Sequence, residues 1–162
     1  MRTVRRPDPP TGVRRMLFRL PIQAYRMGLG GLFGRRFLLL HHVGRVSGAP
    51  RRVVLEVVEH DPAEGWYVVA SGFGTGADWY RNVLAHPEVS IQVGRRTMPA
   101  RAERLTPDDG GEFMARYAPR HRRIAVRLVR FMGFQVDGSV DDYREVGRAI
   151  PFVRLVPQPP AG

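Results

Sequence analysis

The sequence predicts a mainly β fold of the α+β class, in which six antiparallel strands form a closed or partly split barrel with flanking helices. Two observations lead to this prediction. Residues 37–105 contain short runs of branched and aromatic residues, separated by turns that glycine and proline mark. Helical periodicity appears near both ends of the chain and between some strands, without the regular strand–helix alternation of a parallel sheet.

The predicted strands follow one another in hairpins. Gly44, Gly48 and Pro50 mark the turn after the first strand, and residues 61–65 form a second turn around Pro62. Two hairpins in succession are typical of an antiparallel meander. The six strands are expected at residues 37–43, 52–59, 66–71, 89–93, 98–105 and 152–156.

Capping signals and periodicity predict four helices among and after these strands. Thr106 is suited to cap a helix, because Pro107 and two acidic residues follow it in the first turn. The helices are expected at residues 78–85, after Thr106, at 120–132 and at 141–148. The apolar face expected for the third of them comprises Ile124, Leu128, Phe131 and Met132.

The chain is expected to hold one core, because 162 residues are the size of one domain. Its organisation is predicted as a flexible basic arm (1–12), an amphipathic helix (13–34), the barrel domain (35–157) and a tail (158–162). The helix packs on the domain or lies on an anionic membrane surface, and the sequence leaves both alternatives open.

Several function classes are disfavoured by composition. The chain has no cysteine, and its five histidines show no zinc-binding spacing, so no metal site is expected. No signal peptide and no apolar stretch long enough to span a membrane are recognised. We therefore expect a cytoplasmic protein, with peripheral attachment to the inner face of the cell membrane left open.

The charge pattern favours an anionic partner. The formal net charge is +11, and all 26 basic residues are arginine. Such a surface attracts nucleic acid, an acidic membrane, or a phosphorylated or polycarboxylate ligand. Nucleic acid is the less favoured partner, because the sequence shows neither an RNA-binding aromatic signature nor a helix-turn-helix pattern.

The connection at residues 44–52 is the first segment that could bind such a ligand. Arg45, Arg51 and Arg52 place three guanidinium groups around a tight turn, and Ser47 and Gly48 add a hydroxyl and exposed amides. The alternative is an ordinary hairpin with solvated arginines.

The second segment, residues 71–80, combines three glycines with Ser71 and the aromatic pair Trp79 and Tyr80. Glycines let a backbone approach a ligand closely, and flat aromatic rings suit a ring system. An aromatic pair early in a helix also occurs as core packing. The segment matches neither a Walker A loop nor a dinucleotide-binding GxGxxG motif.

Together the two segments resemble the deazaflavin-dependent nitroreductase family, which uses coenzyme F-420. That family shares a split β-barrel with flavin-binding pyridoxamine oxidase-like proteins. The resemblance rests on the GRxSGxPR pattern at Gly44–Arg51 and on the stretch from Trp79-Tyr80-Arg81-Asn82-Val83 to His86-Pro87. It runs over residues 38–105 and resumes at 150–153.

The resemblance implies roles for individual residues. Arg45, Ser47 and Arg51 would hold the phosphate and acidic tail of F-420, Ala70 and Ser71 would line the deazaflavin ring, and Trp79 would border it. The complete set of expected cofactor-binding residues is Arg45, Ser47, Gly48, Arg51, Arg52, Ala70, Ser71, Gly72 and Trp79. Val46 stands where the family often has a basic residue.

The resemblance further implies an oxidoreductase that transfers a hydride from reduced F-420 to a quinone, an enone or a nitroaromatic. Tyr117 and Tyr143 are the candidate catalytic residues, with a packing role as the alternative for Tyr143. Other readings stay open: the same fold carrying FMN, a tetrapyrrole or a fatty acid, or a non-enzymatic basic module on an acidic membrane or nucleic acid. FMN is the less favoured cofactor, and a homodimer is also left open.

Overall fold

The computed structural model of the chain describes residues 2–3, 36–72 and 74–159. The predicted amphipathic helix at 13–34 and most of the predicted arm therefore lie outside the described residues. Within the arm, Arg2–Thr3 form the short strand β1.

The described residues form two compact units. The first, here called the helical unit, comprises β1, Ala70–Ala77 and Arg104–Phe152. The second, here called the sheet unit, comprises residues 36–69, Asp78–Glu103 and residues 153–159. Each unit is described by itself below.

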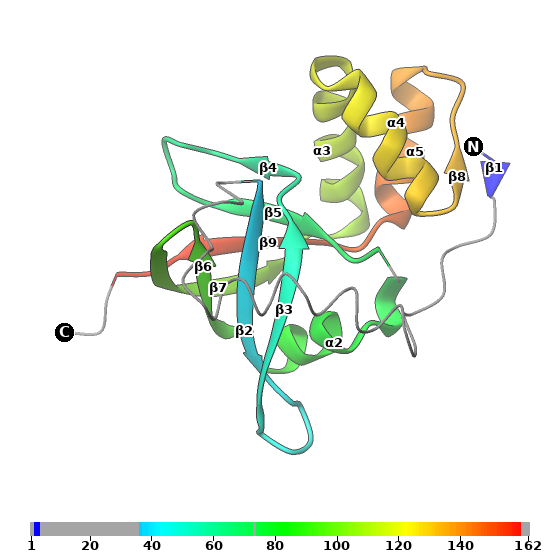
Figure 1. The fold of residues 1–162 in the computed structure, drawn as a ribbon. Coiled ribbons are helices and arrows are strands. Elements are labelled where there is room, and N and C mark those ends of the chain that lie inside the picture. The colour runs from blue at the N-terminus through cyan, green and yellow to red at the C-terminus, as the bar shows by residue number, and fades with distance from the viewer. Residues whose placement is uncertain (1, 4–35, 73, 160–162) are drawn as a thin grey trace, which may run out of the picture. The chain divides into compact units, whose positions relative to one another are not determined.

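The strands of the sheet unit, some of whose end residues belong to the helical unit, form one seven-stranded sheet. They are β2 (Phe37–Val43), β3 (Pro50–Glu56), β4 (Glu59–His60), β5 (Tyr67–Ala70), β6 (Glu88–Val93), β7 (Arg96–Arg104) and β9 (Phe152–Pro157). Their order in the sheet is β3-β2-β6-β7-β9-β5-β4 (Figure 1). The pairs β2–β3, β2–β6, β6–β7 and β4–β5 are antiparallel.

The sheet is curled, because the chain connects its two edges directly. Strands β3 and β4 lie at opposite edges, yet only Val57 and Val58 separate them in the sequence. The Val57 N–H donates to the carbonyl oxygen of Arg36 at 2.8 Å, and the Val58 N–H donates to that of Val68 at 2.8 Å. Two consecutive residues thus form hydrogen bonds near the two opposite ends of the strand order. This is possible only when the sheet curls into a half-barrel.

The α+β class is confirmed, as a curled antiparallel half-barrel with helices, whereas the predicted count of six strands was wrong. The predicted single strand at 52–59 is two strands, β3 and β4. It breaks at Val57–Val58, where the backbone hydrogen bonds change from Arg36, just before β2, to Val68 of β5.

Helix α2 (Asp78–Ala85) packs against β2 in the sheet unit, beside the β2–β3 hairpin (Figure 1). The helix occupies the predicted residues 78–85. Its buried residues are Trp79, Tyr80, Asn82 and Val83. The helix therefore presents one amide, that of Asn82, to the interior beside three apolar or aromatic side chains.

The helical unit contains α3 (Pro107–Arg120), α4 (Arg122–Phe131), α5 (Val140–Ala149), the 3-10 turn η2 (Gly74–Gly76), and the two-stranded pair of β1 with β8 (Phe134–Gln135). The predicted cap of α3 is confirmed, since Thr106 Oγ1 accepts from the Asp109 N–H at 3.1 Å. In α4 the buried side chains are Ala125 and Val129. Of the expected apolar face, Met132 is buried and Leu128 half-buried, whereas Ile124 and Phe131 are 43% and 49% exposed, so the prediction was wrong for these two residues.

Two glycines set the distance between α3 and α5. A methyl group built on Gly147 would lie 2.4 Å from the carbonyl oxygen of Gly110 and 2.7 Å from Met114 Cβ. Both atoms belong to rigid parts of α3, so neither can move away easily. The close approach of these helices therefore depends on the absence of a side chain at this crossing.

Substitution of Gly147 by alanine should destabilise the protein by about 1–3 kcal/mol, because the added methyl group overpacks the helix crossing. Gly76→Ala is the matched control, since a methyl group there meets nothing within 4 Å. Chemical denaturation of both variants measures the difference. Equal midpoints for the two variants would contradict the assigned role of Gly147.

Candidate anion-binding site

The loop between β2 and β3 is closed by its own backbone. The Gly44 N–H donates to the Ala49 carbonyl oxygen at 2.9 Å, and the Gly48 N–H donates to the Gly44 carbonyl oxygen at 2.8 Å. Gly48 has a φ of 69°, a conformation that glycine adopts without strain. Ser47 Oγ accepts from the Ala49 N–H at 3.1 Å, so the Ser47 hydroxyl proton can still be donated to a ligand.

Ser47 and Arg51 converge over Gly44. A methyl group built on Gly44 would lie 2.6 Å from Ser47 Oγ and 3.3 Å from Arg51 Nε. Both side chains are exposed. A hydroxyl and a guanidinium group therefore lie on the same side of the loop, an arrangement that suits a phosphate or carboxylate oxygen.

Arg45 is held against helix α2. Its backbone N–H and its Nη1 donate to Asn82 Oδ1 at 3.0 and 2.9 Å, and Nη1 and Nη2 each lie 3.4 Å from Asp78 Oδ1. Asp78 and Asn82 are four residues apart and so share one face of the helix. The Arg45 side chain is 27% exposed, so a ligand can reach part of it.

Asn82 connects Arg45 to a buried histidine. Its Nδ2 lies 3.2 Å from His42 Nδ1, and the two residues are only 2% and 6% exposed. Burial, together with the positive charge of Arg51, lowers the pKa of His42 to about 4, although the charge of Asp78 opposes the shift. The ring is therefore neutral near pH 7.

The structure separates Arg52 from the other predicted arginines. In the β2–β3 register His42 lies opposite Arg51, and His41 lies opposite Arg52. Successive side chains on a strand point to opposite faces, so Arg52 points away from the face of Arg51. The site that the loop and α2 form therefore contains Arg45, Ser47 and Arg51.

Trp79 is mainly buried. It is 8% exposed, and its ring contacts that of Tyr80 edge to face at a centroid distance of 5.9 Å and an angle of 89°. This contact agrees with the packing alternative for the aromatic pair. Any contact of Trp79 with a cofactor would have to use the small exposed part of its ring.

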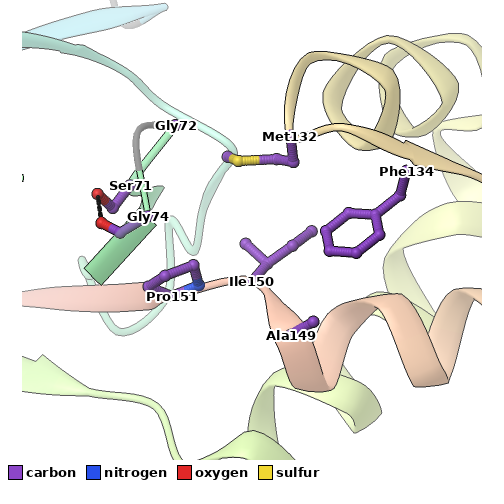
Figure 2. Close-up of a pocket in the computed structure, with 8 residues that line it drawn as sticks. All are labelled: Ser71, Gly72, Gly74, Met132, Phe134, Ala149, Ile150 and Pro151. Carbon is purple, nitrogen blue, oxygen red and sulfur yellow. Dashed lines mark hydrogen bonds between the residues drawn. The ribbon is translucent and has the colours of Figure 1, made fainter. Parts of the chain in front are cut away.

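Ala70, Ser71 and Gly72 belong to the helical unit. The buried Ser71 donates its N–H to the Pro151 carbonyl oxygen at 2.9 Å and its hydroxyl to the Gly74 carbonyl oxygen at 2.5 Å. Figure 2 shows the latter bond closing the turn that contains Gly72. Ser71 thus shapes the glycine-rich loop, and its hydroxyl proton is already committed.

A small depression of the helical unit borders this loop (Figure 2). It is lined by Ser71, Gly72, Gly74, Met132, Phe134, Ala149, Ile150 and Pro151. Its empty volume is about 170 Å³ including open solvent. Ligand pockets usually measure roughly 300–1,000 Å³, so this depression alone does not accommodate a tricyclic ring.

The two candidate catalytic tyrosines are packed inside the helical unit. Tyr117 is 2% exposed, stacks on Phe113 at a centroid distance of 5.5 Å, and contacts His121 at 4.5 Å. Tyr143 is 6% exposed, and burial raises its pKa. Neither tyrosine lines the depression beside Ser71. These contacts favour packing for both residues, and a catalytic role stays a prediction.

Residues 2–3, 36–72 and 74–159 offer neither a metal site nor a membrane span. No group of three or more histidine, aspartate or glutamate side chains in these ranges could hold a metal ion. Within the same residues, no helix has the length and apolar character needed to cross a membrane. The cytoplasmic location, the membrane contact of residues 13–34 and the homodimer stay predictions.

Sequence reasoning missed three polar residues of the site: His42, Asp78 and Asn82. The sequence contains a signal for each of them: Asp78 and Asn82 are spaced by four residues in a helix that the sequence predicts. His42 follows Leu38 and Leu40 at strand alternation, which indicates that its side chain points into the core. The hydrogen bonds between β2 and α2 could not be inferred without their relative placement.

The fold is similar to that of solved structures, and the family follows from the sequence. An F420-H2-dependent reductase, FDR-A, is 27% identical at a TM-score of 0.46, with coverage of 75% of this chain and 95% of that one. At a TM-score of 0.53 the fold is similar to the heme storage protein HutZ of Vibrio cholerae, with 19% identity and coverage of 83% and 89% of the two chains. The chain thus shares the fold of HutZ.

The family is shown by the sequence itself. Residues 17–132, well over half of the chain, match the family model of the F420H(2)-dependent quinone reductases. An F420H(2)-dependent quinone reductase of Mycobacterium tuberculosis is 34% identical over 101 residues, which span 57% of this chain and 66% of that relative. The chain belongs to the F420H(2)-dependent quinone reductase family, and the expected resemblance to F-420 enzymes is confirmed.

The buried His42 should make folding stability depend on pH. Its pKa is about 4 in the folded protein, against 6.5 for an unperturbed histidine, so the unfolded chain binds the extra proton between these values. The free energy of unfolding therefore decreases as the pH falls from about 6.5 towards 4. The loss should approach about 3 kcal/mol, at roughly 1.4 kcal/mol per unit of pKa.

Denaturant titrations from pH 7.5 to 4 measure this loss, and His42→Asn provides the reference because it removes the titrating ring. The free energy of unfolding of wild type should fall relative to that of the variant as the pH decreases through this window. Parallel stability curves would contradict the buried, neutral state of His42.

Proposed function

We propose that the chain binds reduced coenzyme F-420 and transfers a hydride from it to a quinone. The main structural support is that Arg45, Ser47 and Arg51 place cationic and hydroxyl donors around one closed loop. F-420 carries a phosphate and a polyglutamate tail, which are the anionic groups that such donors bind. Membership of the F420H(2)-dependent quinone reductase family supports the same cofactor.

The residues of the sheet unit fit the anionic part of this coenzyme. Arg51 and Ser47 are exposed on the same side of the loop, and the Arg45 side chain stays partly exposed while Asn82 holds it. These residues would bind and orient the coenzyme, and Asp78 would have to yield its weak contact with Arg45 to an incoming anion. The deazaflavin ring supplies the hydride when the coenzyme is bound.

A quinone is the proposed acceptor, as the family name indicates, and an enone or a nitroaromatic is the alternative acceptor. No nucleophilic side chain is required, since the coenzyme carries the redox chemistry and the protein provides binding, orientation and exclusion of water. The proton that accompanies the hydride can come from a tyrosine or from water.

The direct test is titration of the purified protein with F-420, followed by fluorescence of the coenzyme. We expect saturable binding at low micromolar concentration, and reduction of a soluble quinone by reduced F-420 in the same preparation. Absence of saturable binding would refute the cofactor. Binding without turnover on quinones, enones or nitroaromatics would refute the reaction and leave a carrier of the coenzyme.

Arg51→Ala should weaken F-420 binding by about tenfold or more, because it removes a charge-assisted contact with the phosphate end. Arg95→Ala is the matched control: it removes the same exposed charge from a different turn, between β6 and β7. The dissociation constants are compared at two salt concentrations. Equal losses for both variants would indicate diffuse charge attraction and no defined phosphate site.

A further inference from the structure

We propose that His42 is a positioning residue of the anion site, which orients the Asn82 amide so that its oxygen holds Arg45 towards the bound anion. The inference deepens the proposed function and rests on it for the identity of the anion, the phosphate end of F-420. It assigns a role to the contact of His42 Nδ1 with Asn82 Nδ2 at 3.2 Å.

The orientation of the Asn82 amide follows from the chemistry of its neighbours. The backbone N–H and the guanidinium group of Arg45 are donors only. Both lie at about hydrogen-bond distance from one atom of the amide, at 3.0 and 2.9 Å, so that atom must be the oxygen. The amide NH₂ group must then point to His42.

A further consequence concerns the tautomer of His42. Because the Asn82 NH₂ group donates, His42 Nδ1 must accept, and the ring proton must be on Nε2. A proton on Nδ1 would place two donors against each other inside the protein, where an unmet donor costs free energy. The low pKa of His42, caused mainly by burial, keeps Nδ1 free of a proton at neutral pH.

The pair is fixed because both partners are buried on different elements. His42 lies on β2, which the sheet holds on both sides, and Asn82 lies on α2. Their exposures of 6% and 2% leave little space for the amide to turn over. A rotated amide would present NH₂ to Arg45, so donors would face donors and Arg45 would lose both bonds.

Asn82 differs from Asp78 in how it holds Arg45. The Asp78 side chain is 79% exposed and lies 3.4 Å from the guanidinium group, so solvent weakens that ion pair. The Asn82 oxygen is buried and makes the two shorter bonds. When an anion displaces Asp78, Arg45 therefore keeps its position through Asn82, which in turn depends on His42.

The first test is nuclear magnetic resonance of ¹⁵N-labelled protein at pH 7. We expect the Nδ1 resonance of His42 in the range of an unprotonated nitrogen and the Nε2 resonance in the protonated range. A proton on Nδ1 would overturn the proposal. This measurement needs no coenzyme, so its outcome is independent of the proposed function.

The second test compares substitutions that differ in the acceptor. His42→Leu removes the acceptor and should raise the dissociation constant of F-420 and the KM for reduced F-420 about tenfold, with kcat changed less than about twofold. His42→Asn places an oxygen near the position of Nδ1 and should restore binding to within about threefold of wild type. His41→Leu, the neighbour whose side chain points to the other face of β2, should bind as wild type.

A purely structural role of His42 predicts a different pattern. It would lower the melting temperature of His42→Leu without a selective change in KM, and His42→Asn would not rescue binding; either result overturns the proposal. If His42→Leu does not fold, the Nδ1 resonance of His42 and the F-420 binding of His42→Asn test the proposal. If wild type itself does not bind F-420, the proposed function fails. The positioning role is then tested by the exchange of the Arg45 guanidinium protons with solvent. These protons should be protected in wild type and in His42→Asn but not in His42→Leu.

Discussion

The guanidinium group of Arg45 can only donate hydrogen bonds, so its position is decided by the acceptors that surround it. The structure provides two: the buried oxygen of Asn82 and the exposed carboxylate of Asp78, both on α2. The buried acceptor fixes the side chain, and the exposed one balances its charge. The geometry of the candidate site follows from this pairing between the β2–β3 loop and one face of a helix.

The half-barrel makes this pairing available. Strand β2 lies inside the sheet and packs against α2, and the buried His42 continues the line of Leu38 and Leu40 towards Gly44. The closed loop then directs Ser47 and Arg51 over Gly44. A rigid scaffold with a short loop holds cationic groups at a defined spacing at a smaller entropic cost than a flexible arm would.

Much of this fold could be predicted from local signals. The strands at the hairpins, helix α2 and the Thr106 cap depend on turn chemistry and periodicity, which neighbouring residues express directly. The break at Val57–Val58 could not be predicted, because both residues have strong strand character and only the curl of the sheet separates their partners. The α4 face was misjudged for a similar reason: which of two adjacent apolar stripes is buried depends on the elements packed against the helix.

The candidate site was predictable in its charges and less so in its connections. The motif at Gly44–Arg51 predicts the arginines of the loop. The separation of Arg52 from Arg51 depends on strand alternation. The buried pair of His42 and Asn82 depends on the packing of α2 on β2. Ser71 uses its hydroxyl to close a turn, and its predicted place beside a ring stays a prediction. Motifs thus indicate which residues are near a site, whereas their hydrogen-bond partners decide what each of them does.

A crystal structure of the complex with F-420 would show whether this loop binds the coenzyme. Phosphate or carboxylate oxygens of the coenzyme should lie at roughly 3 Å from the Arg51 guanidinium group and the Ser47 hydroxyl, with Arg45 still bonded to Asn82 and displaced from Asp78. A coenzyme whose anionic groups lie away from this loop, or an Arg45 released from Asn82 in the complex, would contradict this arrangement.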